Sequence, residues 1–281
     1  MNKAKNKTII IHSKVSYGYV GSSTTSLVLQ VAGFDVLTVP TVLYSNRLGC
    51  ATVGGGPVPE ELFAGILEGI LKLDIAREVS TIITGFIGSV KQIEITAAFV
   101  AKMKAANPAI RLLCDPVMGD TDKGLYVPGD IPVALIKHLI PLADMLTPNP
   151  FEMERITGKE VNLENNSIET WKDSFDLARQ TIVLTGGHTT EKNHIDNYMI
   201  GNNHYEIIKS KKINIHPPGT GELFTAHLHL SLLLGKPLNE AVSLSGDILS
   251  AVLQKMLQEN RKEFDLSDIL FSMNRESISA V

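Results

Sequence analysis

The feature that most constrains the fold is a repeated rhythm, in which a short apolar run is followed by a loop and a helix-like segment. Runs of this length that are apolar almost throughout are typical of strands buried on both faces of a sheet. Strands that alternate with helices predict a parallel sheet with right-handed crossovers. We therefore predict an α/β fold with a mostly parallel central sheet and helices on both faces. The predicted strands are 8–12, 36–41, 80–85, 111–114, 144–147 and 181–184.

Helical periodicity and capping signals place helices between and after these strands. In the helix over 60–71, Leu62, Phe63, Ile66 and Ile70 are expected to face the core. The predicted helices are 22–31, 60–71, 90–106, 222–234, 238–258 and 265–273, and a hairpin is predicted over 197–200 and 206–212. The glycine-rich segment 44–59 is either a mobile flap or slack between a strand and a helix. No repeat, low-complexity stretch or linker divides the chain, so we expect one domain over 1–281.

Composition excludes several classes of protein. The chain has 281 residues, of which 44% are hydrophobic, and a formal net charge of −4, so nothing favours nucleic acid or an anionic membrane as a partner. No apolar run reaches the roughly 18 residues that span a bilayer, and the basic start runs into a strand rather than a signal-peptide core. Two cysteines make no disulfide framework. We expect a cytoplasmic protein.

One glycine turn combines an anion site with an acid. Gly219, Thr220 and Gly221 allow a tight turn whose N–H groups converge, and the helix that follows adds its positive end. Glu222 lies at the edge of that site, where it could accept a proton from a hydroxyl that attacks a bound phosphate. Taken alone, the stretch is equally well interpreted as a turn before a helix that begins with a favourable acid.

Other polar residues follow predicted strands, where ligands bind in parallel sheets. Ser13 follows the first strand, and Asp115 and Asp120 follow the fourth. Two carboxylates in such a loop suit Mg²⁺ bound partly through water. The alternative is turn chemistry around Pro116 and Gly119 without a metal.

The fifth strand is followed by residues with an ordinary structural interpretation as well. Thr147 or Asn149 could cap a helix, and Glu152 could stabilise its first turn. The sixth strand ends in Thr185 and Gly186. None of the eight histidines shows a spacing typical of a metal site, so we expect them to be solvated or structural.

The order of these motifs is similar to that of the ribokinase-like superfamily, and within it the chain resembles the pyridoxal (vitamin B6) kinases. The resemblance covers residues 8–258, and Gly-Tyr-Val-Gly together with Asp-Pro-Val-Met-Gly-Asp is its most specific part. The motifs are Ser13 with Gly18-Tyr19-Val20-Gly21, Thr41-Val42 with Ser45-Asn46, Thr84-Gly85, Asp115-Pro116-Val117-Met118-Gly119-Asp120, Gly124-Leu125-Tyr126-Val127, Pro141-Leu142-Ala143-Asp144, Thr147-Pro148-Asn149 with Glu152, and Gly219-Thr220-Gly221.

The resemblance implies phosphorylation of the 5′-hydroxymethyl group of a B6 vitamer by ATP, in a homodimer that needs Mg²⁺ and is helped by K⁺. It implies a catalytic base at Glu222 and an anion hole at Gly219, Thr220 and Gly221. The remaining roles implied are substrate binding by Ser13, Val20, Val42, Phe86 and Gly49, ATP binding by Asp115, Thr147, Asn149, Thr185 and Gly186, and metal binding by Asp120, Tyr126 and Glu152.

Three residues depart from the family pattern. Glu222 stands where the family has Asp, Gly49 where close bacterial relatives have a histidine, and Phe86 where a tyrosine is frequent. A base displaced by about 1 Å can slow a reaction on the order of 100-fold, although Glu and Asp have nearly the same basicity. Two alternatives stay open. One is a hydroxymethylpyrimidine-type kinase of the same superfamily, a branch that also shows Asp-Pro-Val-Met and Thr-Pro-Asn. The other, motivated by Glu222 and Gly49, is a homologue that binds a B6 vitamer or nucleotide without useful turnover.

Overall fold

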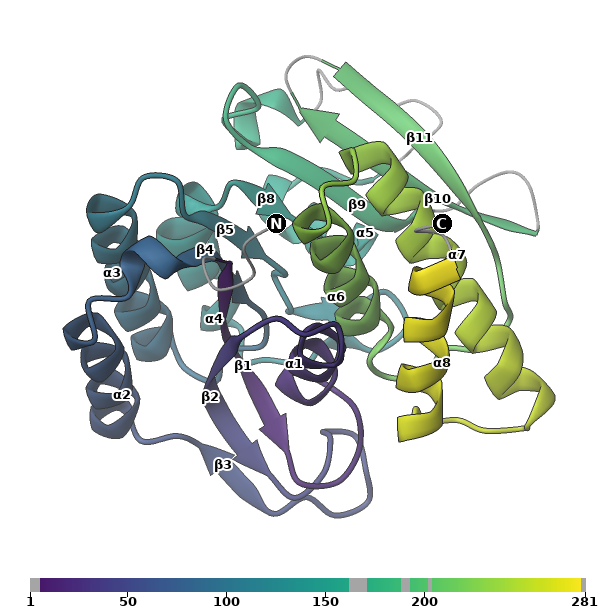
Figure 1. Ribbon diagram of the computed structural model, residues 1–281, viewed down its shortest axis with the longest axis horizontal. Coiled ribbons are helices and arrows are strands. Elements are labelled where there is room, and N and C mark those ends of the chain that lie inside the picture. Colours follow the sequence, from purple (N-terminus) through teal and green to yellow (C-terminus); the bar gives the residue numbers. More distant parts are fainter. Residues whose placement is uncertain (1–5, 162–170, 188–192, 202–203, 279–281) are drawn as a thin grey trace.

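The computed structural model describes residues 6–161, 171–187, 193–201 and 204–278. Within these residues, a nine-stranded sheet with the order β11-β10-β9-β8-β5-β4-β1-β2-β3 forms the centre of the molecule (Figure 1). The parallel strands are β1 (Lys7–Val15), β2 (Val36–Tyr44), β4 (Val79–Thr84), β5 (Arg111–Cys114), β8 (Met145–Leu146) and β9 (Thr181–Gly187). The antiparallel edge strands are β3 (Gly55–Pro57), β10 (His194–Gly201) and β11 (His204–Lys211), and a separate hairpin pairs β6 (Gly119–Asp120) with β7 (Gly124–Leu125).

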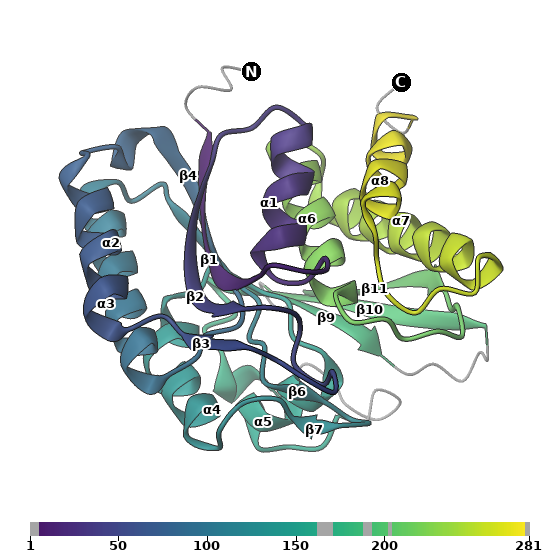
Figure 2. The same ribbon diagram turned by 90° about the horizontal axis from the view of Figure 1, so that it is seen from below.

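Helices cover both faces of the sheet (Figure 2). Successive side chains of a strand point to opposite faces, and β1 shows this directly: Ile9 and Ile11 belong to one apolar core, and Ile10 belongs to the other. The first core is covered by α2 (Glu60–Lys72), α3 (Val90–Ala106), α4 (Asp130–Ala134) and α5 (Pro150–Thr157). The second is covered by α1 (Ser22–Val31), α6 (Thr220–Leu233), α7 (Leu238–Gln258) and α8 (Leu266–Ile278).

The predicted fold class is confirmed, and so are the predicted strands and helices, apart from shifts at some of their ends. The hairpin of β10 and β11 is confirmed as well, while residues 202–203 of its turn lie outside the described part of the chain. Segment 44–59, called the flap below, is not merely an irregular connection, because β3 within it pairs with β2. Among the strands and α-helices of the described residues, β3, β6, β7 and α4 were not predicted.

One predicted core residue is wrong. Leu62 is 56% exposed, whereas Phe63, Leu67 and Ile70 form the buried face of α2. The helix is rotated so that this face meets the sheet, and a residue directly before Phe63 then points outward, since neighbours in sequence do not share a helix face.

Helix α6 is buried nearly all round, including its two histidines. His229 Nε2 lies 2.9 Å from Thr8 Oγ1 on β1, and His227 Nε2 lies 2.8 Å from Ser272 Oγ on α8. Both rings therefore tie α6 to its neighbours, in agreement with the structural role expected for them. No helix in the described residues is long and apolar enough to cross a membrane.

Candidate active site

The glycine turn before α6 has the geometry expected of an anion site. Gly219 adopts a left-handed conformation with φ of 100°, and Thr220 begins the helix. A Cβ atom built on Gly219 would lie 2.7 Å from the carbonyl oxygen of Tyr19, so both the backbone angle and the space require glycine here. The first N–H groups of a helix have no partner within the helix. The turn can therefore present N–H groups and the helix dipole to an anion.

Glu222, in the first turn of α6, reaches a loop that is distant in sequence. Its Oε1 accepts a hydrogen bond of 3.0 Å from the backbone N–H of Gly21, which lies 201 positions earlier in the chain. A Cβ atom on Gly21 would lie 2.2 Å from Ser13 Oγ, so Ser13 is packed beside the same loop. Within the described residues Glu222 Oε2 accepts no hydrogen bond. The fold thus brings the predicted base to a predicted substrate residue and leaves one carboxylate oxygen for a proton.

Two buried carboxylates lie next to this turn. Asp115 follows β5, and its Oδ2 is 3.8 Å from the position that a Cβ atom on Gly221 would occupy. Glu152, in the first turn of α5, accepts hydrogen bonds from the N–H groups of Met118 (3.0 Å) and Asn149 (2.9 Å). The Asn149 side chain accepts the Glu152 N–H in return, at 2.9 Å, which completes a capping box.

Both carboxylates hold their protons more tightly than usual. Burial, followed by the charges of Glu152 and Glu222, raises the pKa of Asp115 well above its ordinary value. Burial raises the pKa of Glu152 to about 8 against the opposing effect of its backbone N–H donors, and the charge of Glu222 adds to the rise. Three carboxylates therefore lie close enough for their charges to interact: Asp115 after β5, Glu152 in the first turn of α5 and Glu222 in the first turn of α6.

This donor set fits a magnesium ion. Mg²⁺ is usually held by one or two carboxylates, with water and substrate phosphates completing its shell, and two buried carboxylates with raised pKa values would gain from a divalent cation. A cluster of three or more His, Cys, Asp or Glu side chains with metal spacing is absent from the part of the chain that the structure describes. Asp115 and Glu152 are the residues that would hold the ion, together with phosphate oxygens.

Asp120 and Tyr126 lie together on the β6–β7 hairpin. The Tyr126 hydroxyl donates a hydrogen bond to Asp120 Oδ2, while Oδ1 accepts the N–H groups of Asp122 and Lys123, each at 2.9 Å. Burial and the Asp120 carboxylate raise the pKa of Tyr126. The turn chemistry considered as the alternative for this loop is therefore present at Asp120, and the metal-binding role of the pair stays a prediction.

Apart from Asp115, the residues predicted to bind ATP lie after β8, at the start of α5 and near the end of β9. Thr147, after β8, is buried with its Oγ1 3.3 Å from Thr225 Oγ1 of α6. Thr185 N donates to Pro148 O at 2.9 Å, and Gly186 has φ of 71° at the end of β9. The Asn149 amide also donates to Gly119 O at 2.8 Å. These contacts join the ends of β8 and β9 to α6 and to the β6–β7 hairpin, while the binding roles stay predictions.

The predicted substrate residues are not all equally accessible. Val20 and Phe86 are half-buried, and the Phe86 carbonyl accepts a hydrogen bond from Thr41 Oγ1 at 2.7 Å. Val42 is fully buried, and a Cβ atom on Gly88 would come within 2.7 Å of its Cγ1. Gly49 is exposed on the flap with φ of 88°. Val20 and Phe86 can therefore meet a ligand as the structure stands, and Val42 only if its cover shifts.

One residue at the site was missed by sequence reasoning. His12 is 2% exposed, and its Nδ1 accepts the backbone N–H of Ser13 at 2.8 Å. Its ring lies against Gly85, where a Cβ atom would approach Nε2 to 2.1 Å. Burial lowers the pKa of His12, although Glu222 opposes this. The available signal was its position directly before Ser13 at the end of a buried strand.

The fold and the arrangement of this site are those of a kinase of the ribokinase-like class: a glycine turn opens a buried helix, an acid lies in its first turn, and two buried carboxylates lie nearby. The chain belongs to the phosphomethylpyrimidine kinase family, whose family model matches residues 24–266. The resemblance to vitamin B6 kinases expected from the motifs is confirmed by its similarity to known proteins.

Two relatives and one solved structure illustrate this similarity. A pyridoxine/pyridoxal/pyridoxamine kinase of Bordetella avium is 30% identical over 87% of this chain and 83% of its own length. A pyridoxal kinase of Rubrobacter xylanophilus is 30% identical over 91% of this chain and 89% of its own length. The pyridoxal kinase of Leishmania donovani, solved in complex with ADP and pyridoxamine, superposes with a TM-score of 0.84 at 25% identity, over 97% of this chain and 96% of that one.

Proposed function

We propose that this protein transfers the γ-phosphoryl group of ATP to the 5′-hydroxymethyl group of pyridoxal, pyridoxine or pyridoxamine. The observation that carries the proposal is the hydrogen bond of Glu222 with Gly21 at the start of α6, because it places an acid between an anion site and the Ser13 loop. The relatives named for B6 vitamers, and the solved relative with ADP and pyridoxamine, support the same pair of substrates.

The arrangement suggests how the chemistry is divided. The N–H groups of Gly219 to Gly221 hold the oxygens of the γ-phosphate, as electrostatic stabilisation of a transferred phosphoryl group requires. The vitamer hydroxyl attacks the γ-phosphorus while Glu222 accepts its proton, and the bond from that phosphorus to the bridging oxygen of ADP breaks. Ser13, Val20 and Phe86 orient the pyridine ring, and Thr147, Asn149, Thr185 and Gly186 contact the nucleotide.

Magnesium would neutralise charge on the ATP phosphates when bound by Asp115 and Glu152, with Asp120 and Tyr126 nearby. We also infer activation by K⁺ and a homodimer, both of which the family resemblance implies, and a single kinase domain over residues 1–281, because no repeat, low-complexity stretch or linker divides the sequence. The two cysteines, Cys50 and Cys114, are free thiols, which suits the reducing cytoplasm that we propose as its location.

The test is a kinase assay of wild type, Glu222→Asp and Glu222→Gln on the three vitamers and on hydroxymethylpyrimidine, with Mg²⁺ and K⁺ present. We expect the wild type to phosphorylate at least one vitamer. Loss of a general base typically costs about 10²- to 10⁴-fold, so kcat should fall by that factor in Glu222→Gln and stay measurable in Glu222→Asp. A faster Asp variant would measure what the extra methylene of Glu222 costs.

Other results would overturn the proposal in distinct ways. Exclusive phosphorylation of hydroxymethylpyrimidine would assign the chain to that branch of the family. Vitamer binding in calorimetry without ADP release at high enzyme concentration would make it a binding protein. Activity that appears only in Glu222→Asp would identify a kinase site that has lost its turnover.

A further inference from the structure

The connection between α7 and α8, residues 259–265, reaches the flap. Glu263 Oε1 accepts hydrogen bonds from Arg47 Nη2 at 2.8 Å and from Arg47 Nε at 3.1 Å. The two side chains are 26% and 41% exposed, so the ion pair is partly shielded from solvent. Arg47 lies near the start of the flap, before its glycines at 49 and 54–56. This contact therefore joins the flap to the C-terminal part of the chain.

The same connection also supports the catalytic turn. Phe264 is 5% exposed, and a Cβ atom on Gly219 would lie 3.2 Å and 3.3 Å from two atoms of its ring. Arg47, Glu263 and Phe264 line one small hollow together with Pro218 and the loop 17–20. The flap, the anion turn and a predicted substrate loop thus meet at the α7–α8 connection.

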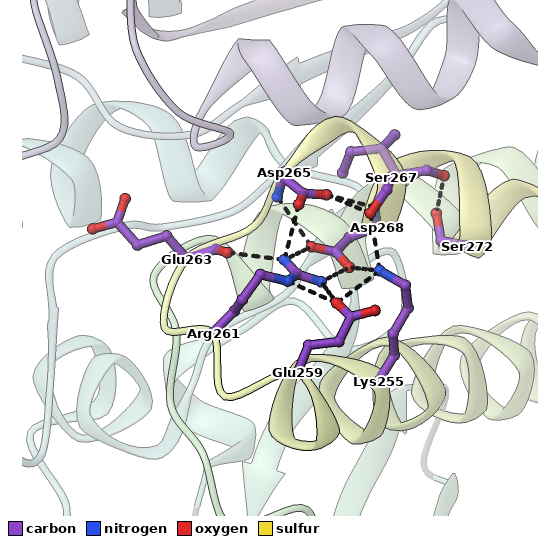
Figure 3. A network of polar contacts seen from close by, with 9 residues as sticks. Lys255, Glu259, Arg261, Glu263, Asp265, Ser267, Asp268 and Ser272 are labelled. Carbon is purple, nitrogen blue, oxygen red and sulfur yellow. Dashed lines mark hydrogen bonds and ion pairs between the residues drawn. The ribbon is translucent and has the colours of Figure 1, made fainter.

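An ion network around one buried carboxylate joins the connection to α7 and α8 (Figure 3). Asp268 is fully buried and binds Arg261 through both carboxylate oxygens, at 2.5 and 2.6 Å, and Lys255 at 2.8 Å. Arg261 also donates to the backbone carbonyl of Glu263 at 3.3 Å. Although burial opposes ionisation, the hydrogen bonds from Arg261 and Lys255 lower the pKa of Asp268. The carboxylate is therefore charged at neutral pH, and its ion pairs with Lys255 of α7 and Arg261 tie the connection to both helices.

We propose that Glu263 is a positioning residue of the kinase, which anchors the flap through Arg47 so that the flap is held beside the bound vitamer. This inference rests on the proposed function. A segment with four glycines between residues 49 and 56 loses more conformational entropy on closing than an ordinary loop. The ion pair of Arg47 with Glu263 restricts the flap before the substrate binds, so that less conformational entropy is lost on binding. Glu263 thereby favours vitamer binding without touching the reacting atoms.

The experiment compares wild type with Glu263→Gln, Arg47→Gln and the reversed pair Arg47→Glu/Glu263→Arg. The matched control is Glu94→Gln, which removes another partly exposed ion pair, that of Lys91 and Glu94 at 2.9 Å on α3. Each protein is assayed for kcat and for the KM of the vitamer and of ATP. Hydrogen–deuterium exchange of segment 44–59 is measured in the same proteins without substrate.

Each single variant should raise the vitamer KM about two- to fivefold, the size expected for a partly exposed ion pair, with kcat and the KM of ATP close to wild type. Exchange in 44–59 should be faster in both variants, and the reversed pair should restore both properties. Glu94→Gln should change neither. Unchanged exchange and unchanged vitamer KM in Glu263→Gln would overturn the proposal. If the wild type phosphorylates no vitamer but exchange in 44–59 is still faster in the variants, the anchor is supported and the proposed function is overturned instead.

Discussion

At the residue scale, the site depends on glycines that no other residue could replace. Gly219 combines a left-handed backbone with contacts to Tyr19 and Phe264, and Gly21 is pressed against Ser13 while it donates to Glu222. These contacts fix where the anion turn lies relative to the acid. If the acid and the turn act as proposed, a base and a phosphate held in this way need little further ordering before reaction.

Substitution of Gly219 by Ala should be damaging in a specific way. The added Cβ would lie 2.7 Å from Tyr19 O, so the turn must move, and a displacement of about 1 Å can cost on the order of 100-fold in kcat. The control is Gly158→Ala, since Gly158 also has a positive φ, of 67°, but has nothing within 4 Å of the added atom. Both variants should lose about 1 kcal/mol of stability from backbone strain, and only Gly219→Ala should lose turnover. Equal kcat in the two variants would contradict this account.

The outcome at single residues shows what sequence can predict. Glu222 and Ser13 could be proposed separately from local patterns, Ser13 from the rule that ligands bind at the carboxyl ends of parallel strands. Only the family resemblance implied that the two act together, because α6 follows the antiparallel strand β11. Val42 was placed on the substrate although it is buried beneath Gly88, because accessibility depends on a neighbour 46 positions away. The partners Arg47 and Glu263, 216 positions apart, carry no signal in either local sequence.

At the element scale, long apolar segments were predicted well, and three of the very short strands were missed, although the two-residue strand β8 lies within the predicted strand 144–147. Strands such as β1 and helices such as α3 carry their own periodicity, so their pattern suffices to place them. Strands β6 and β7 have two residues each and β3 has three, which is too short for any alternation to be visible. The buried face of α2 was misjudged at Leu62 because the sheet, not the helix, decides which side is covered.

The packing of α6 on β1 predicts a pH dependence of stability. Burial lowers the pKa of His229 to about 4, from an ordinary value of 6.5. The unfolded chain therefore binds a proton between these values that the folded protein excludes, and stability falls as the pH drops from 6.5 toward 4. The free energy of unfolding attributable to His229 should decrease by about 3 kcal/mol over that interval.

Urea unfolding of wild type and His229→Gln at pH 7 and pH 4.5 checks this expectation. Glutamine keeps a polar group near Thr8 but does not titrate, so the stability of the variant should decline less with acid. Parallel declines in the two proteins would show that other groups carry the acid sensitivity.

At the scale of the whole molecule, the site is assembled from both ends of the chain. The loops after β1, β4 and β5 come from the first half, and α5, β9 and α6 come from the second. A ligand that contacts both sets of loops binds only the folded state. Such binding stabilises the folded state by an amount that rises with the ratio of ligand concentration to Kd.

ADP with Mg²⁺ and a vitamer should therefore raise the melting temperature together, without turnover. At a concentration of 100 times its Kd, one ligand adds about 2.7 kcal/mol. Differential scanning calorimetry with ADP, with pyridoxal and with both checks this, and AMP, which lacks the outer phosphate, serves as the control. A melting temperature that none of these ligands moves would contradict the site as described.

The contact of Glu222 with Gly21 has a consequence for synthesis of the protein. A ribosome makes the first strands of the sheet long before it makes α6, so a nascent chain displays Ser13 and the flap while it still lacks the proposed base, Glu222, and the proposed anion hole. Translation that stops before residue 219 would leave a product without either. The order of synthesis thus keeps the newborn chain from acting as a kinase until the final third of the chain has emerged and folded back onto its beginning.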